Sequence, residues 1–253
     1  MTRAGAWAAR AGALITVAAL VAATLAGCGA SPEKLGPTGV DELTIPTPSP
    51  DPADFSRRAT NPWFPLVAGT RWTYRQDTVT TMSTVVAEVL PGTREIAGVP
   101  TTAVRWWVVE RGDQRLAATR WYAVDRDRNV WWFGQQVAPG SPPIDPLARR
   151  SFEAGRDGAE AGLVLPAHPR DGDGFWNARQ PGVVERRSTV LSLDATVATT
   201  RQTFRHTLAT RDLSSLEPVH TVQAYFAPGV GLVAQQDTAA TSETLTLVRV
   251  RRP

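Results

Sequence analysis

Apolar and polar residues alternate along most of the chain from Asn61 onward, where Val, Thr, Trp, Tyr and Phe dominate the runs. A period of two in β-branched and aromatic residues is typical of strands with one buried face. No window in this part of the sequence shows the 3.6-residue apolar repeat of an amphipathic helix. The pattern predicts ten strands, at residues 69–76, 78–90, 99–110, 116–125, 129–136, 183–197, 200–212, 218–227, 230–236 and 242–250.

The connections between these runs are short and rich in turn-forming residues. Ala97-Gly98, Gly112-Asp113, residues 125–129 and Pro228-Gly229 are all of the kind that closes hairpins. Consecutive strands with short connections favour antiparallel meanders over parallel βαβ units. We therefore predict a mainly β fold, a single domain of antiparallel meandering strands arranged as a curved sheet, half-barrel or sandwich.

Residues 138–182 interrupt the strand pattern. They are rich in Pro, Gly and Asp, and a loop of this length inside a compact domain is usually functional or disordered. Their apolar residues argue against disorder: Phe152, Leu163, Val164, Leu165, Phe175 and Trp176. We expect one long ordered excursion that crosses an open face or end of the sheet.

Tryptophan is the most distinctive residue of the predicted strands. Trp106-Trp107, Trp121-Tyr122 and Trp131-Trp132-Phe133 place aromatic rings side by side in the sequence, and adjacent residues of a strand point to opposite faces. One ring of each group should face the core, and something must cover the rings on the other face. Packing by the protein itself is the simpler interpretation. The alternative is a ligand groove roofed by the excursion, with candidate ligand-binding residues Trp106, Trp107, Trp121, Trp131, Trp132 and Trp176.

The N-terminus has the pattern of a secretory signal. Arg3 and Arg10 precede an apolar, Ala-rich run, and Leu25-Ala26-Gly27-Cys28 follows it. Small residues before a cysteine resemble the bacterial lipobox, in which the thiol accepts a diacylglyceryl group. An uncleaved transmembrane helix is the alternative, but the Ala, Gly and Thr content makes this run a poor permanent anchor. We predict a signal peptide at 1–27 and lipidation of Cys28 on the outer face of the bacterial cell membrane.

Residues 28–54 are predicted to be a tether. They have too little apolar surface to order a packed structure, and their prolines favour extended segments. The prolines lie at positions 32, 37, 46, 48, 50 and 52. The Trp-rich β domain then spans residues 55–253. Cys28 is the only cysteine, so no thiol remains for a disulfide, a metal or a nucleophile.

The charge balance excludes an obvious polyanion partner. Removing Arg3 and Arg10 with the signal lowers the formal net charge from +3 to +1, which does not predict nucleic-acid binding. Arg186-Arg187 and the C-terminal arginines are read as charges that mostly face water. No cofactor motif is found, and the partners that remain are the membrane, through Cys28, and an envelope component or lipophilic ligand.

One short motif has a simple structural interpretation. Asp125, Asp127 and Asn129 resemble the start of a calcium loop, but Val130 and Gln136 stand where such a loop needs glycine and glutamate. A hairpin turn capped by its own side chains is the better prediction. The histidines show no zinc-ligand spacing, so no metal site is predicted.

The excursion holds the remaining candidates for chemistry. His168 lies between two prolines and is a weak site candidate, as are Glu153 and Asp157. Paired carboxylates are what glycoside hydrolysis requires, but loop spacing cannot establish their separation. G-x-S-x-G, Walker A and G-x-G-x-x-G motifs are absent from the sequence. The sequence therefore favours a non-catalytic protein.

Three segments resemble an uncharacterised family of exported bacterial lipoproteins. They are N-P-W-F-P-L-V-A-G-T-R-W-T-Y at 61–74, W-Y-A-V-D-R-D-R-N-V-W-W-F-G at 121–134 and Y-F-A-P-G-V-G-L-V at 225–233. The resemblance implies an exported β protein and carries no activity with it. Arg128 departs from the family pattern, because a turn glycine is usual at that position. Tethered antiparallel sheets are also similar in architecture to the half-barrel lipid carriers of bacterial envelopes, although fold does not imply function.

Three functional hypotheses follow. The leading one is a membrane-tethered, non-catalytic module that binds an envelope component or lipophilic ligand on its Trp-bearing sheet. The second is a structural or protein-interaction lipoprotein whose tryptophans all belong to the core. The third is a hydrolase that uses the carboxylates of the excursion. A Trp-lined cavity would favour the first, a flat apolar patch the second, and two acids brought together in a cleft the third.

Overall fold

The computed structural model describes residues 50–55, 59–141, 144–239 and 243–253. The predicted signal peptide and Cys28 lie outside the described residues, as does the predicted tether up to residue 49. A 3-10 turn, η1 (Pro52–Asp54), opens the described part. The strands are β1 (Arg71–Asp77), β2 (Met82–Val89), β3 (Arg94–Ile96), β4 (Val99–Glu110), β5 (Asp113–Val124), β6 (Val130–Val137), β7 (Phe152–Glu153), β8 (Glu160–Leu165), β9 (Gly174–Gln180), β10 (Val184–Ala198), β11 (Thr203–Ser214), β12 (Val222–Ala227), β13 (Gly231–Asp237) and β14 (Thr244–Arg251).

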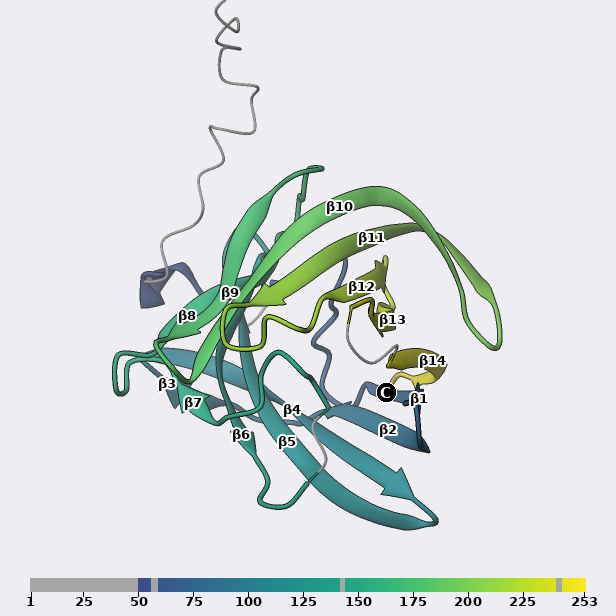
Figure 1. Ribbon diagram of the computed structural model, residues 1–253. Helices are drawn as coiled ribbons and strands as arrows, with labels where there is room; N and C mark the ends of the chain where they lie inside the picture. Colours follow the sequence, from purple (N-terminus) through teal and green to yellow (C-terminus); the bar gives the residue numbers. More distant parts are fainter. Residues whose placement is uncertain (1–49, 56–58, 142–143, 240–242) are drawn as a thin grey trace, which may run out of the picture. The chain divides into compact units, whose positions relative to one another are not determined.

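The strands form one antiparallel sheet that closes on itself (Figure 1). Its order is β2-β1-β14-β13-β12-β11-β10-β9-β8-β6-β5-β4, and β2 also pairs with β4 along Thr84–Val89. The closure makes a barrel of twelve strands, to which β3 and β7 add short pairings with β4 and β6. Closing the sheet gives each of these twelve strands a partner on both sides over at least part of its length.

The predicted fold class is confirmed, since the described residues form a mainly β domain of antiparallel strands. Each of the ten predicted strands has a counterpart within a few residues. The closed barrel is more specific than the three sheet forms that the sequence left open. Closure depends on the pairing of β2 with β4, which are not consecutive strands. The local alternation of apolar and polar residues does not predict such a pairing.

The excursion is built differently from the prediction. Residues 152–180 do not only cross the sheet; they contribute β8 and β9 to the barrel wall. Gly162 explains part of this path, because a Cβ at Gly162 would lie 2.3 Å from the carbonyl oxygen of Trp176. The residue allows β8 and β9 to approach more closely than side chains permit.

The turn between β5 and β6 confirms the predicted hairpin. The Asp125 carboxylate accepts hydrogen bonds from the backbone and side-chain nitrogens of Asn129, at 2.8 and 2.9 Å, and from the indole of Trp131 at 2.8 Å. Arg128 has a φ of +68°, the left-handed backbone that a turn glycine adopts without strain. Residue 128 is therefore a position where the backbone conformation favours glycine.

Two segments cover the ends of the barrel. At the end with the β5–β6 turn, the Asn61 side-chain amide donates to the carbonyl oxygens of Arg128 (2.8 Å) and Leu165 (3.2 Å), and Pro62 accepts from Gly229. At the opposite end, where β6 finishes, the Gln135 amide donates to the carbonyl oxygens of Ala148 and Arg150. Residues 144–151 of the excursion thereby cover that end, as expected for part of the excursion.

The hairpin of β10 and β11 extends beyond its neighbours as a long curved arm (Figure 1). β9 pairs with β10 only as far as Thr189, and β12 pairs with β11 only from Leu208 onward. Irregular register between Val190 and Val197 bends the arm, since bulges add local twist.

Among the described residues there is no helix with the length and apolarity required to span a membrane.

Candidate functional site

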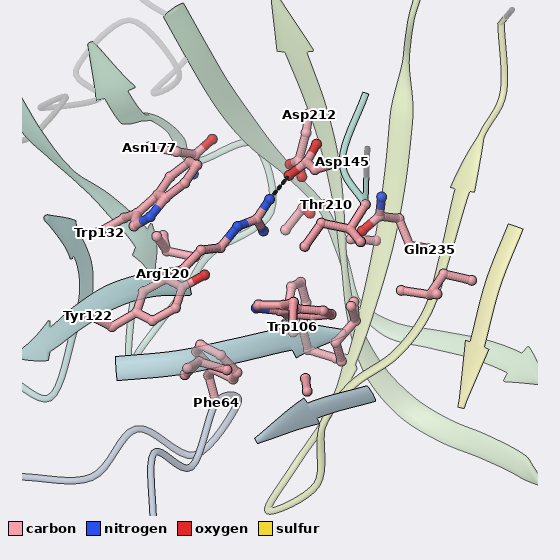
Figure 2. Close-up of a pocket in the computed structure, with 18 of the residues that line it drawn as sticks. Phe64, Trp106, Arg120, Tyr122, Trp132, Asp145, Asn177, Thr210, Asp212 and Gln235 are labelled. Atoms are coloured by element: carbon pink, nitrogen blue, oxygen red, sulfur yellow. Dashed lines mark hydrogen bonds and ion pairs between the residues drawn. The ribbon is translucent and has the colours of Figure 1, made fainter. Parts of the chain in front are cut away.

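The barrel encloses a cavity of about 70 Å³ with an aromatic wall (Figure 2). Inward-facing residues of the first strands and the N-terminal covering segment form that wall: Phe64, Trp72, Tyr74, Trp106, Tyr122 and Trp132. All six side chains are buried. The volume is below the range of about 300–1,000 Å³ typical of ligand pockets and is enough for a few waters.

The aromatic wall is well packed. Tyr74 stacks on Trp106 with ring centroids 6.1 Å apart, and Phe64 meets Tyr122 edge to face at 5.3 Å. Burial raises the pKa of both tyrosines above the ordinary value. Both phenols therefore stay protonated, and the hydroxyl of Tyr74 donates to the carbonyl oxygen of Leu232 at 3.1 Å.

A buried cluster of two arginines and two aspartates lies against this wall. Arg186 on β10 donates through Nη1 to Asp145 and through Nη2 to Asp212, the latter at 2.7 Å. Arg120 on β5 donates to the same Asp145 oxygen at 3.0 Å, the pair joined in Figure 2. Ser188 donates to the second oxygen of Asp212 at 2.6 Å. The four charges sum to zero, which is the condition under which a group of ions can be buried.

Arg120 is also held between two tryptophans. Its guanidinium carbon lies 5.1 Å from the centre of the Trp132 ring and 5.6 Å from the centre of the Trp106 ring. Both distances are within the range of cation–π attraction, which strengthens when the groups are desolvated. The inward tryptophans therefore position a charge as well as filling space.

Asp145 remains ionised despite its burial. Burial alone would raise the pKa of this carboxyl, but Arg186 and Arg120 lower it to about 2, with help from the backbone N–H of Leu147. The pKa of Arg186 is raised, because the two aspartates outweigh the effect of its own burial. The charged form of the cluster is therefore the stable one at neutral pH.

Two residues that line the cavity each have a buried N–H donor without an acceptor among the described residues. In the part of the chain that the structure describes, four buried side-chain nitrogen or oxygen atoms form no hydrogen bond, and two of these are Trp106 Nε1 and Arg186 Nε. A buried donor without an acceptor costs about 1–3 kcal/mol. Their presence in one cavity marks the place where a hydrogen-bond acceptor would be stabilised.

The six candidate tryptophans divide between the two faces of the sheet. Trp106 and Trp132 line the cavity. Trp107 is half-buried on the outside, with the guanidinium of Arg71 6.0 Å from its ring centre. Trp121 and Trp131 are buried on the same outer side, and Trp176 is half-buried next to the inward-facing Asn177.

The protein itself covers the outer rings. Arg94 lies 4.6 Å from the ring centre of Trp121. Phe55 packs edge to face on Trp131 and Phe133, with centroids 6.3 and 5.2 Å apart. The predicted division of each aromatic group between the two faces is thus observed, and the outer face is covered by protein groups.

The weak candidates of the excursion do not join this cavity. Glu153 and Asp157 line a separate open groove of about 360 Å³ beside Trp121. The Glu153 carboxylate is paired with Arg94 at 2.5 Å and Arg156 at 2.8 Å, which ties β7 to β3. Such a doubly paired carboxylate is suited to holding strands together.

The other polar residues of the excursion lie elsewhere. His168 is exposed in the β8–β9 loop and accepts a hydrogen bond at Nε2 from Arg128 at 2.8 Å. Asp173 pairs with Arg170 at 3.3 Å in the same loop. The described residues contain no group of three or more His, Cys, Asp or Glu that could hold a metal ion.

The charged cluster was not predicted from the sequence, and the prediction that Arg186 faces water is wrong. Arg186 does not face water: its side chain is 12% exposed and bonded to two aspartates. The sequence does contain one sign of the cluster: Arg120 and Asp212 are charged residues at inward positions of strands that otherwise alternate. Asp145 gives no such signal, because it comes from a loop.

These features define a closed antiparallel β-barrel whose aromatic interior contains a neutral ion cluster. No family model matches the chain, and no curated protein matches it. Among solved structures, the chain is similar to a putative exported protein with a YmcC-like fold from Bacteroides fragilis, with 14% identity and a TM-score of 0.44. It is also similar to a putative lipoprotein from Parabacteroides distasonis, with 10% identity and a TM-score of 0.38. Each likeness covers 77% of this chain and 100% of the other, and at these scores implies no function.

Proposed function

We propose that this chain is an exported bacterial lipoprotein, held on the outer face of the membrane by lipid on Cys28, whose barrel binds a small, mainly apolar ligand. The observation that carries the binding proposal is the aromatic cavity with two buried donors, Trp106 Nε1 and Arg186 Nε, that no atom of the described residues satisfies. The export proposal rests on the sequence around Cys28.

The charged cluster supports binding over packing alone. A buried group of ions is often less stabilising than apolar side chains of the same volume. Arg186, Asp145 and Asp212 are nevertheless buried and line the same cavity as the aromatic side chains. The cluster fixes the positions of donors at the cavity, as preorganised recognition requires.

The volume limits what can be bound. A cavity of about 70 Å³ accommodates a small molecule or one end of a longer one, and not a whole lipid. This restricts the hypothesis of a lipophilic ligand to the part of the ligand that enters the barrel. The groove beside Trp121 is larger but open, and Arg94 covers the ring.

A second candidate function is protein interaction without a small-molecule ligand. It is favoured by two exposed apolar side chains next to the turn between β1 and β2, Val79 at 80% and Met82 at 71% exposure. Together they are too few to form a large patch. This candidate would also explain why the aromatic side chains fill most of the interior.

Native mass spectrometry of the full lipoprotein, released from its own membrane in mild detergent, tests the binding proposal. We expect a reproducible extra mass that is lost on denaturation. Trp106→Phe removes an inward donor and should reduce the occupancy, whereas its sequence neighbour Trp107→Phe changes an outer ring and should not. A bare polypeptide mass in the wild-type protein would contradict ligand binding and favour the interaction hypothesis.

The same experiment tests the anchor. The wild-type protein should carry the mass of a diacylglyceryl group on Cys28 and lack residues 1–27. Cys28→Ala should abolish that mass and keep the signal peptide attached. An unmodified, uncleaved wild-type chain would contradict lipidation.

A further inference from the structure

We infer that the ligand of the barrel presents a neutral carbonyl-type oxygen, as in an acyl ester or a ketone, to Trp106 Nε1 and Arg186 Nε. This inference rests on the proposed function and names the chemical class of its ligand. Three properties of the cavity support it: the kind of polar group left unsatisfied, the charge of the surrounding cluster, and the apolar wall.

The unsatisfied groups are both donors. An indole N–H and a guanidinium N–H can only donate hydrogen bonds, so their partner must be an acceptor. The two terminal nitrogens of the Arg186 guanidinium already donate to Asp145 and Asp212. Trp106 and Arg186 line the same cavity, so an acceptor bound there can take a hydrogen bond from one of these donors without displacing either aspartate.

The charge of the cluster favours a neutral acceptor. Arg120 and Arg186 are balanced by Asp145 and Asp212, all within one hydrogen-bonded group. A bound anion would add a fifth, uncompensated charge beside two carboxylates, and burying an unpaired charge is strongly unfavourable. A carbonyl oxygen accepts the same hydrogen bonds without that penalty.

The wall favours an apolar body behind the oxygen. Phe64, Tyr74 and Leu232 line the cavity with carbon atoms, and the Tyr74 hydroxyl is already bonded to a carbonyl oxygen. A polyol such as a free sugar would bury several hydroxyls against such a surface, where each unpaired one is costly. A molecule with one acceptor and few donors fits this distribution.

Methyl acetate and acetate are matched probes, because they share the acetyl group and differ in charge at neutral pH. The full lipoprotein is placed in nanodiscs of ether-linked phospholipid, which has no acyl carbonyl of its own. The readout is the indole N–H resonance of Trp106 in nitrogen-15 spectra, assigned by its disappearance in Trp106→Phe. The outer Trp107 resonance, assigned by Trp107→Phe, is the control.

We expect methyl acetate to move the Trp106 resonance saturably and to leave Trp107 unchanged, while acetate at the same concentration has no effect. Trp106→Phe should weaken methyl acetate binding about fivefold, as expected for one lost hydrogen bond, and Trp107→Phe should not. Because the probe comparison is made on the wild-type protein, it stands even if a variant fails to fold.

The failures are distinguishable. If acetate moves the Trp106 resonance as strongly as methyl acetate, the neutral-acceptor inference is overturned while ligand binding stands. If a native ligand is found by mass but methyl acetate leaves Trp106 unmoved, the inference is again overturned and the proposed function survives. If no ligand mass is found and neither probe binds, both fail together.

Discussion

The two faces of β4, β5 and β6 use the same residue type for different purposes. On the outer face, Trp131 is covered by Phe55 and Trp121 by Arg94, which are groups of the protein itself. On the inner face, Trp106 and Trp132 flank Arg120 and border a cavity. Both pairs are buried to a similar extent, so burial alone does not separate them.

The difference lies in the polar groups beside each ring. The indole N–H of Trp131 donates to Asp125 in a hairpin turn, which is a complete structural arrangement. Trp106 lines the cavity, and its indole N–H has no acceptor among the described residues. A count of tryptophans therefore says little about ligand binding, whereas the hydrogen-bond state of each indole distinguishes a structural ring from a candidate binding ring.

The largest expected effect comes from removing a charge of the inner cluster. Asp145→Asn leaves Arg120 and Arg186 without the carboxylate that they share. We expect a loss of about 3–5 kcal/mol in the free energy of unfolding, the usual cost of breaking a buried pair. Urea-induced unfolding measures it. Glu110→Gln, at the exposed pair with Arg115, should change stability by less than about 0.5 kcal/mol; equal losses would show that the cluster is not energetically special.

The second-largest effect is expected from acid, which should reduce the stability that the inner charged cluster contributes. The pKa of Asp145 is about 2 in the fold, against an ordinary value of 3.8. A lowered pKa favours the ionised form, so this contribution is complete above about pH 4 and disappears as the pH falls through 2. The shift corresponds to about 2 kcal/mol. Urea unfolding at several values between pH 5 and pH 2 measures how the free energy of unfolding falls with pH. The contribution of Asp145 should be absent in Asp145→Asn. If the free energy of the variant falls as steeply as that of the wild type, the acid sensitivity belongs to other groups.

Removing the side chain that covers Trp131 on the outer face should lower the free energy of unfolding by a smaller amount. Phe55 is half-buried and contacts Trp131 and Phe133. Phe55→Ala should reduce the free energy of unfolding by about 1.5 kcal/mol, roughly the lower value for burying a large apolar side chain. Tryptophan fluorescence should shift to the red as Trp131 meets water. Ligand occupancy by native mass spectrometry should stay unchanged, and a loss of occupancy would mean that the two faces are coupled.

The smallest effect is expected at Trp107. Arg71→Gln removes the guanidinium above this outer ring and an exposed contact with Glu88 at 3.6 Å. Exposed cation–π and ion pairs contribute about 0.5 kcal/mol. Urea unfolding at low and high salt should show a small difference that salt reduces. A loss above about 2 kcal/mol would show that Trp107 belongs to the core.

Local alternation predicted most of the fold. Strands such as β4 and β14 were found because their inward and outward residues alternate along the chain. β8 and β9 were missed, although E-A-G-L-V-L and G-F-W-N-A-R-Q contain apolar residues, because Gly162 and the surrounding Pro and Gly residues read as a loop. The glycine that concealed the strand is the residue that permits its close pairing with β9.

The candidate site was less predictable. Alternation placed one aromatic ring of each group inside, and the structure assigns that position to Trp106, Tyr122 and Trp132. It could not bring Arg120 to Arg186 and Asp145, because their proximity depends on the order of strands in the closed barrel. A charged residue at an inward strand position is the only local sign of such a cluster, and it does not name the partner.

The pairing of β1 with β14 has a consequence for how the barrel forms. Arg71, near the start of the domain, lies opposite Arg251, near its end, so the ring cannot close until the last strand has been delivered. Contacts of this sequence separation are slow to form, because the loop between them must lose its entropy first. A chain that crosses a membrane from its N-terminus would therefore remain open throughout translocation. Its first strands would depend on transient protection from aggregation until Arg251 emerges.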